Sequence, residues 1–196
     1  MKIAVFVLLS FALLNASPVS EGNKLFANGD YGKALESYLS ARKENPAEPA
    51  LFYNIGTCQY MLGNYEEAIK ELEPAVRFPD SSLAAKAAYN LANAYFRSGE
   101  KAESATKIEA WRQSIAYLKK AIELVPNYEK AKKNIEIVQR RLKEALDEQK
   151  NEQQEIVHQQ LDGSTFTTWK SPWINIDNVL GIVSKSAHNM AFGDRS

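Results

Sequence analysis

Few side chains of this 196-residue chain could carry out chemistry, and they are widely separated. Its two histidines, His158 and His188, lie far apart in the sequence, and Cys58 is its single cysteine. A nucleophilic cysteine needs a neighbouring base and a lowered pKa, whereas Cys58 falls within an expected helix at a position that normally packs. Metal-ligand spacing, a glycine-rich phosphate loop and a nucleophile elbow are missing as well. The sequence therefore predicts no catalytic residues, no metal site, no cofactor and no small-molecule substrate.

Charge and composition point away from nucleic acid and toward an ordinary globular protein. Lys+Arg and Asp+Glu each total 24, so the formal net charge is zero and no basic excess attracts a phosphate backbone. The hydrophobic fraction is 45%, which is typical of a chain with a packed core. The length is sufficient to bury a sizeable core in one domain.

One segment of the chain recurs at a fixed spacing. Residues 22–34, GNKLFANGDYGKA, align with residues 56–68, GTCQYMLGNYEEA, and Gly, Gly, Tyr and Ala recur 34 residues apart. A third copy contains residues 89–100, YNLANAYFRSGE, which parallel residues 53–64, YNIGTCQYMLGN, at a displacement of 36. A partial fourth copy, NYEKAKKNIEIV, covers residues 127–138. Apolar residues follow helical spacing and no strand pattern competes, so we predict an all-α fold.

Small residues and prolines mark where the expected helices cross and end. We expect close crossing of two helices at the first small position of each copy, which holds Gly22, Gly56 and Ala92. We expect each first helix to end in a left-handed conformation, which costs little only for glycine, at Gly29, Gly63 and Gly99. Pro46 and Pro126 should stop the second of the two helices expected in their copies. Ser17 and Pro18 form an N-cap and first-turn pair, so the first helix should begin there.

This 34-residue period resembles the tetratricopeptide repeat, a helix–turn–helix unit. The resemblance covers residues 17–142 and implies a short helical solenoid of about three repeats and a capping helix. Residues 78–85 add two residues between repeats two and three, and residues 99–113 insert about ten within repeat three. Because the insertion is rich in Ala, Glu and Lys, we expect it to lengthen one helix. Trp111 would then be buried at the position that Tyr31 and Tyr65 hold in the first two repeats.

In this family the first helices of successive repeats line a concave groove, so the resemblance implies a groove that binds a peptide or helix of a partner protein. Aromatic rings can cover apolar side chains of such a peptide, and side-chain amides can bond its backbone. The predicted groove residues are Asn23, Phe26, Tyr53, Asn54, Thr57, Tyr60, Tyr89, Asn90, Asn93, Phe96, Arg97, Lys130, Lys133 and Asn134. For the aromatic residues, helix stacking without ligand contact is the competing interpretation.

Two further interpretations concern the partner. Some chaperone adaptors of this family clamp a C-terminal carboxylate with Lys and Asn, then Asn, then Lys and Arg on successive first helices. The corresponding residues are Val19, Asn23, Asn54, Lys86 and Asn90, so two of the three cations are missing and we do not expect this clamp. The alternative to an adaptor is a structural repeat protein that assembles with itself and has no external ligand.

The two ends of the chain differ from the repeats. Residues 1–16 combine Lys2, an apolar run and small residues, which predicts an export signal cleaved after Ala16 and a periplasmic or envelope-associated protein. The run is shorter than the roughly 20 residues that span a bilayer. Residues 143–162 are charged and Gln-rich, which predicts a helical extension or linker. Residues 163–196 form an apolar tail without periodicity, for which we expect partner binding or self-association.

A signal peptide, a few repeats, YNLANAYFR, NYEKAKKNIEIV and a Lys/Glu/Gln-rich stretch follow one another in this chain. This order resembles the exported tetratricopeptide proteins of bacterial aerotolerance (Bat) operons. The resemblance implies a scaffold for membrane complexes that contain von Willebrand A-type domains and support stress tolerance.

Overall fold

The computed structural model describes residues 17–163. The predicted signal peptide, residues 1–16, and residues 164–196 of the predicted tail lie outside the described residues. Seven α-helices and no strand occupy the described part: α2 Pro18–Ala27, α3 Tyr31–Glu44, α4 Pro49–Met61, α5 Tyr65–Ala75, α6 Ser81–Glu100, α7 Ser104–Leu124 and α8 Glu129–Gly163. The prediction of an all-α fold is confirmed.

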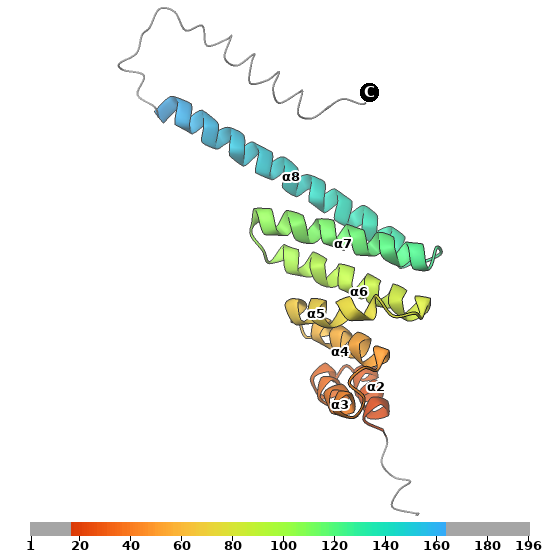
Figure 1. Cartoon of the computed structure of the whole chain (residues 1–196). Coiled ribbons are helices and arrows are strands. Elements are labelled where there is room, and N and C mark those ends of the chain that lie inside the picture. The colour runs from red at the N-terminus through yellow and green to blue at the C-terminus, as the bar shows by residue number, and fades with distance from the viewer. Residues whose placement is uncertain (1–16, 164–196) are drawn as a thin grey trace, which may run out of the picture. The chain divides into compact units, whose positions relative to one another are not determined.

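The helices from α2 to α7 pack in sequence order, each on the next one along the chain (Figure 1). The described residues belong to two units, residues 17–151 and residues 152–163. The first unit holds α2 to α7 and most of α8. In the second unit, residues 152–163 complete α8, and the side chains of residues 152–158 are exposed.

Caps and turns begin and end these helices where the sequence predicts. The Ser17 hydroxyl accepts a bond from the Ser20 backbone N–H at 3.2 Å, and Pro18 occupies the first turn of α2. Gly29 and Gly63 adopt φ values of 84° and 82°, which only glycine tolerates well, at the ends of α2 and α4. The two extra residues before repeat three provide Asp80, whose carboxylate accepts from the backbone N–H groups of Ser82 and Leu83.

The second helices of the three repeats bury the same three positions, spaced by four and three residues. These are Ala34, Tyr38 and Ala41 in α3, Ala68, Leu72 and Ala75 in α5, and Ser114, Leu118 and Ala121 in α7. Ser114 thus holds the place of Ala34 and Ala68, and its buried hydroxyl has no hydrogen-bond partner among the described residues. The repeated core face is what stacks one repeat on the next.

The first helices approach these buried positions with glycine or alanine, the smallest residues. A Cβ atom on Gly22 would lie 2.6 Å from Cε1 of Tyr38, and one on Gly56 would lie 2.6 Å from Cγ of Leu72. Ala92, the third small residue, is completely buried. The predicted close crossing is therefore confirmed at Gly22 and Gly56.

The prediction for Gly99 is wrong. Gly99 does not end α6 in a left-handed conformation, because α6 continues to Glu100 and only Gly29 and Gly63 have positive φ among residues 17–163. A Cβ atom on Gly99 would instead lie 2.8 Å from Cδ1 of Trp111. This glycine makes room for the indole ring.

The insertion in repeat three lengthens a helix, as predicted. α7 has 21 residues, against 14 in α3 and 11 in α5. Trp111 lies inside α7 with 6% of its surface exposed, and its Nε1–H donates to the Phe96 carbonyl at 3.0 Å. The predicted burial of Trp111 is confirmed.

We expect Gly56→Ala to destabilise the protein by about 1–3 kcal/mol, because the added methyl overlaps a buried Leu72 that has no room to shift. The matched control is Gly32→Ala in α3, where a Cβ atom meets nothing within 4 Å. That change should leave stability unchanged or raise it by about 0.4–1 kcal/mol. Urea unfolding of both variants measures the difference, and an equal effect at the two sites would contradict the close crossing.

Trp111→Ala should cost about 3–5 kcal/mol of unfolding free energy, since it removes a buried aromatic ring. Trp111→Phe should cost less, because a ring still packs on Phe96, whose centroid lies 5.6 Å from that of the indole. Thermal and denaturant unfolding by circular dichroism distinguish the variants. A loss below about 1 kcal/mol in Trp111→Ala is inconsistent with a core position.

Candidate functional site

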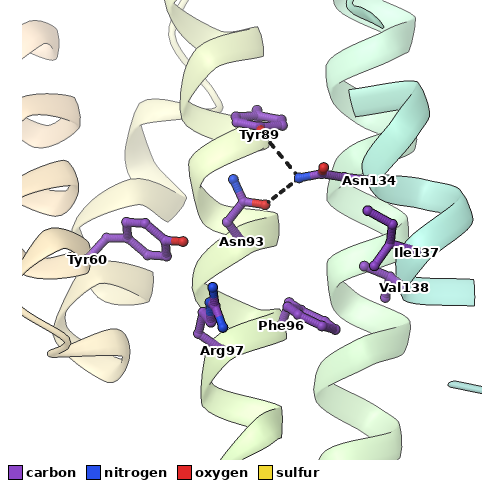
Figure 2. A pocket seen from close by; sticks show the side chains of 8 residues that line it. All are labelled: Tyr60, Tyr89, Asn93, Phe96, Arg97, Asn134, Ile137 and Val138. Carbon is purple, nitrogen blue, oxygen red and sulfur yellow. Dashed lines mark hydrogen bonds between the residues drawn. The ribbon is translucent and has the colours of Figure 1, made fainter. Parts of the chain in front are cut away.

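Two pockets open along the first helices of the repeats, and we call the surface that contains both of them the groove. The first pocket has a volume of about 190 Å³ and is lined by Asn23, Phe26, Tyr38, Tyr53, Asn54 and Thr57 from α2, α3 and α4. The second pocket has a volume of about 300 Å³ and is lined by Tyr60, Tyr89, Asn93, Phe96, Arg97, Asn134, Ile137 and Val138 from α4, α6 and α8 (Figure 2). Eleven of the fourteen predicted groove residues line one of these pockets.

The other three predicted residues line neither pocket. Asn90 donates from Nδ2 to the Thr57 hydroxyl at 3.0 Å, so it supports the wall of the first pocket from α6. Lys130 and Lys133 are exposed on the first turns of α8. They do not form part of the wall of the second pocket, but they add positive charge beside it.

Three pocket residues were not predicted. Tyr38 comes from a second helix, and its hydroxyl donates to Oδ1 of Asn23 at 2.7 Å. Burial, with a smaller contribution from nearby Cys58, raises the pKa of Tyr38 to about 12. Ile137 follows Asn134 by three residues, which is the spacing used for the other groove residues, so the sequence contained the signal for it. No such spacing in the sequence indicated Val138, a buried residue of α8 that lines the edge of the pocket.

Asn134 fastens α8 to α6 across the second pocket. Its side-chain nitrogen donates to Oδ1 of Asn93 at 2.9 Å and to the Tyr89 hydroxyl at 3.2 Å, as Figure 2 shows. The Tyr89 ring also packs on Tyr128, with centroids 5.2 Å apart. These contacts make α8 part of the wall of the groove.

Arg97 supplies the positive charge among the residues that line the second pocket, and no Asp or Glu lines it. Its guanidinium donates to Glu100 on the same helix at 2.8 Å. Hydrogen bonding to Glu100, followed by hydrogen bonding to Tyr60, raises the pKa of Arg97. The guanidinium is charged at any physiological pH.

The aromatic groove residues also stack within their own repeats. Phe26 packs on Tyr31, Tyr60 on Tyr65 and Phe96 on Trp111, with ring centroids 5.1, 5.8 and 5.6 Å apart. These three aromatic residues therefore contribute to the packing of one helix on the next. All three remain partly exposed in a pocket, so ligand contact stays a prediction.

Chemistry by Cys58 is disfavoured by its surroundings. The side chain is completely buried, as predicted, and this burial raises the pKa of the thiol to about 11. Within residues 17–163, no three His, Cys, Asp or Glu side chains come together in a way that could hold a metal ion. In the same part of the chain, no helix combines the length and apolar character that crossing a membrane requires.

Residues 19–82 match a family model described as tetratricopeptide repeat. Over 116 residues the chain is 31% identical to small glutamine-rich tetratricopeptide repeat-containing protein 2 of Mycosarcoma maydis. That alignment covers 59% of this chain and 30% of the relative, so the chain spans less than a third of the relative's length.

Solved structures share the helical arrangement. TTC0263, described as a thermophilic TPR protein of Thermus thermophilus, gives a TM-score of 0.59 at 26% identity, over 65% of each chain. The first TPR of Spaghetti (RPAP3), solved with the HSP90 peptide SRMEEVD, gives a TM-score of 0.55 at 22% identity. The second match covers 64% of this chain and 90% of that chain, and it bears on the fold alone.

We expect Cys58 in the folded protein to react with Ellman's reagent at least about a thousandfold more slowly than in the unfolded chain, because a buried thiol is reached only by opening. A suitable control is Ser40→Cys in a Cys58→Ala background, since residue 40 is exposed on α3 and should react at once. Absorbance at mildly alkaline pH follows both reactions. Rapid modification of native Cys58 would reopen the case for a reactive thiol.

Proposed function

We propose that this chain is a member of the tetratricopeptide repeat family and a non-catalytic adaptor that holds a peptide or helix of a partner protein in the groove. The observation that carries this proposal is the placement of eleven predicted groove residues in two pockets along successive first helices. Partly exposed rings and amides suit an extended peptide, because rings cover apolar side chains and amides bond the backbone. The first TPR of Spaghetti (RPAP3) was solved with a bound HSP90 peptide, so a domain of this fold is able to hold a peptide.

The charges along the groove support a partner that is acidic toward one end. No charged residue lines the first pocket, whereas Arg97 lines the second. Lys130, Lys133 and Arg140 are exposed on the stretch of α8 that contributes to the second pocket. An acidic partner segment would therefore lie over α6 and α8, and its affinity would fall as salt is raised.

The proposed place of action is the bacterial cell envelope, in an aerotolerance- or stress-related membrane complex with von Willebrand A-type domains. Support comes from the signal-like residues 1–16 and from the resemblance to the exported proteins of Bat operons. Mass spectrometry of the protein from its native compartment tests the location. A mature N-terminus at Ser17 agrees with export, and an intact Met1 in the cytosol contradicts it.

The adaptor is tested by filling the first pocket. Asn54→Arg places a long side chain there, and Asn54 makes no side-chain hydrogen bond among the described residues, so folding should not suffer. We expect this variant to lose at least about tenfold in affinity for its partner, because a blocked pocket excludes the peptide. Affinity capture from the native envelope, followed by titration of the captured partner, gives the measurement.

The matched control is Ser40→Arg, which adds the same charge at an exposed position of α3. It should keep both the partner and the oligomeric state. If Asn54→Arg leaves the partner set unchanged and abolishes only self-association, the structural self-assembler replaces the adaptor. Light scattering of both variants separates these two results.

A further inference from the structure

The second pocket offers hydrogen-bond donors in excess of acceptors. Asn134 uses its side-chain nitrogen to donate to Asn93 and Tyr89, which occupies the Asn93 side-chain oxygen. The Asn93 side-chain nitrogen has no partner among the described residues, and Figure 2 shows it on the side away from Asn134. The Tyr60 hydroxyl and the Arg97 guanidinium lie around the same space (Figure 2). Three donors from α4 and α6 thus surround one opening.

Nothing anionic among the lining residues satisfies these donors. Glu100 contacts Arg97 from beside the pocket, with 51% of the arginine side chain and 36% of the glutamate side chain exposed. Such an exposed pair holds its partners weakly. The guanidinium carries five N–H donors; Glu100 accepts from one at Nη1, and the Tyr60 hydroxyl oxygen accepts from another, which leaves N–H groups for a ligand. Arg97 can therefore bind a second carboxylate without leaving its place.

An apolar wall stands opposite these donors. Ile137 of α8 is 43% exposed although it is a large aliphatic residue, and it lines the pocket beside Val138 and Phe96. The same helix provides the Asn134 side-chain oxygen, an acceptor with no partner among the described residues. An acceptor suits a peptide N–H group, and an apolar wall suits an aliphatic side chain.

We propose that the second pocket binds an aspartate or glutamate side chain within a partner peptide, with an aliphatic neighbour of that residue against Ile137. The carboxylate accepts from Arg97, Tyr60 and Asn93, and a peptide N–H donates to Asn134. This proposal rests on the proposed function and specifies the residue that the groove selects. The residues at the positions of the chaperone-tail clamp line the first pocket or neither pocket, so the acidic subsite is a different place and needs no chain terminus.

The test uses the full chain and pools of synthetic nonapeptides that are acetylated and amidated, so that no terminal carboxylate is present. The pools carry a central Leu followed by Glu, Asp, Gln or Lys, with all other positions randomised. Binding of each pool to wild type and to Asn54→Arg, Arg97→Gln, Glu100→Gln and Arg112→Gln is compared by fluorescence polarisation. Arg112 is the control because it is an exposed arginine of α7 that also faces a glutamate three residues away.

Wild type should bind the Glu and Asp pools about tenfold better than the Gln pool, as expected for one charge-assisted contact. Arg97→Gln should remove this preference, so that the Glu, Asp and Gln pools bind it equally. Glu100→Gln should strengthen binding of the Glu pool about two- to threefold, since it releases the competing carboxylate. Arg112→Gln should match wild type.

Two results overturn the acidic subsite while groove binding stands: no acidic preference in wild type, or a preference that survives in Arg97→Gln. Acidic preference that appears only in free-acid versions of the peptides also overturns it, because the pocket then takes a chain terminus. A different result, in which Asn54→Arg binds every pool as well as wild type does, counts against the proposed function itself.

Discussion

The crossing of two helices within a repeat leaves no room for a Cβ atom at Gly22 and Gly56 and room for no more than a methyl group at Ala92, and the groove depends on this constraint. Tyr38 fills the space opposite Gly22, and Leu72 fills the space opposite Gly56. Because the helices approach so closely, the residue four positions after each small residue is brought onto the ring that begins the second helix: Phe26 on Tyr31, Tyr60 on Tyr65 and Phe96 on Trp111. Buried contacts hold one side of the first helix in place, so its other side is presented to solvent at a fixed orientation. The pockets form on that second side.

The third repeat satisfies the same constraint with a larger ring and a longer helix. Trp111 needs more space than Tyr31 or Tyr65, and Gly99 provides it by having no Cβ atom. The indole N–H donates to the Phe96 carbonyl, so this buried donor has a hydrogen-bond partner. The hydroxyl of a tyrosine at the same position would lie elsewhere. This exchange explains why an insertion of about ten residues does not disturb the groove. The added turns of α7 lie before Trp111, and the spacing from Trp111 to Ala121 is that from Tyr31 to Ala41.

Much of this arrangement could be predicted from residues that repeat, and little of it from residues that occur once. The period of Gly, Tyr and Ala predicts the fold and the crossing, because each copy supports the interpretation of the others. The groove residues follow from the family that this period resembles. Gly99 shows the limit: its position in the repeat predicted a helix end, but its function depends on Trp111, which the insertion brought there. The position of Tyr38 is buried in every repeat, and Leu72 and Leu118 occupy it in the next two. The hydrogen bond to Asn23 forms only in the first repeat, because only a tyrosine has the hydroxyl. Ser114 illustrates the same point. The repeat predicts a small residue at this position, but the free-energy cost of burying an unpaired hydroxyl is specific to the serine.

The helix that follows the last repeat determines the polarity of the second pocket. With α8 absent, the Asn93 amide would present one acceptor and two donors to a ligand, and the pocket would discriminate poorly between acidic and amide side chains. Asn134 occupies that acceptor and uses its own donors in doing so. The surface left to a ligand is therefore positive and donor-rich on α4 and α6, with the remaining acceptor on α8. Discrimination then arises because a ligand residue that offers no acceptor leaves these donors unpaired, and burying an unpaired donor costs free energy. A capping helix that protects the last repeat from water thus also sets what the groove can select.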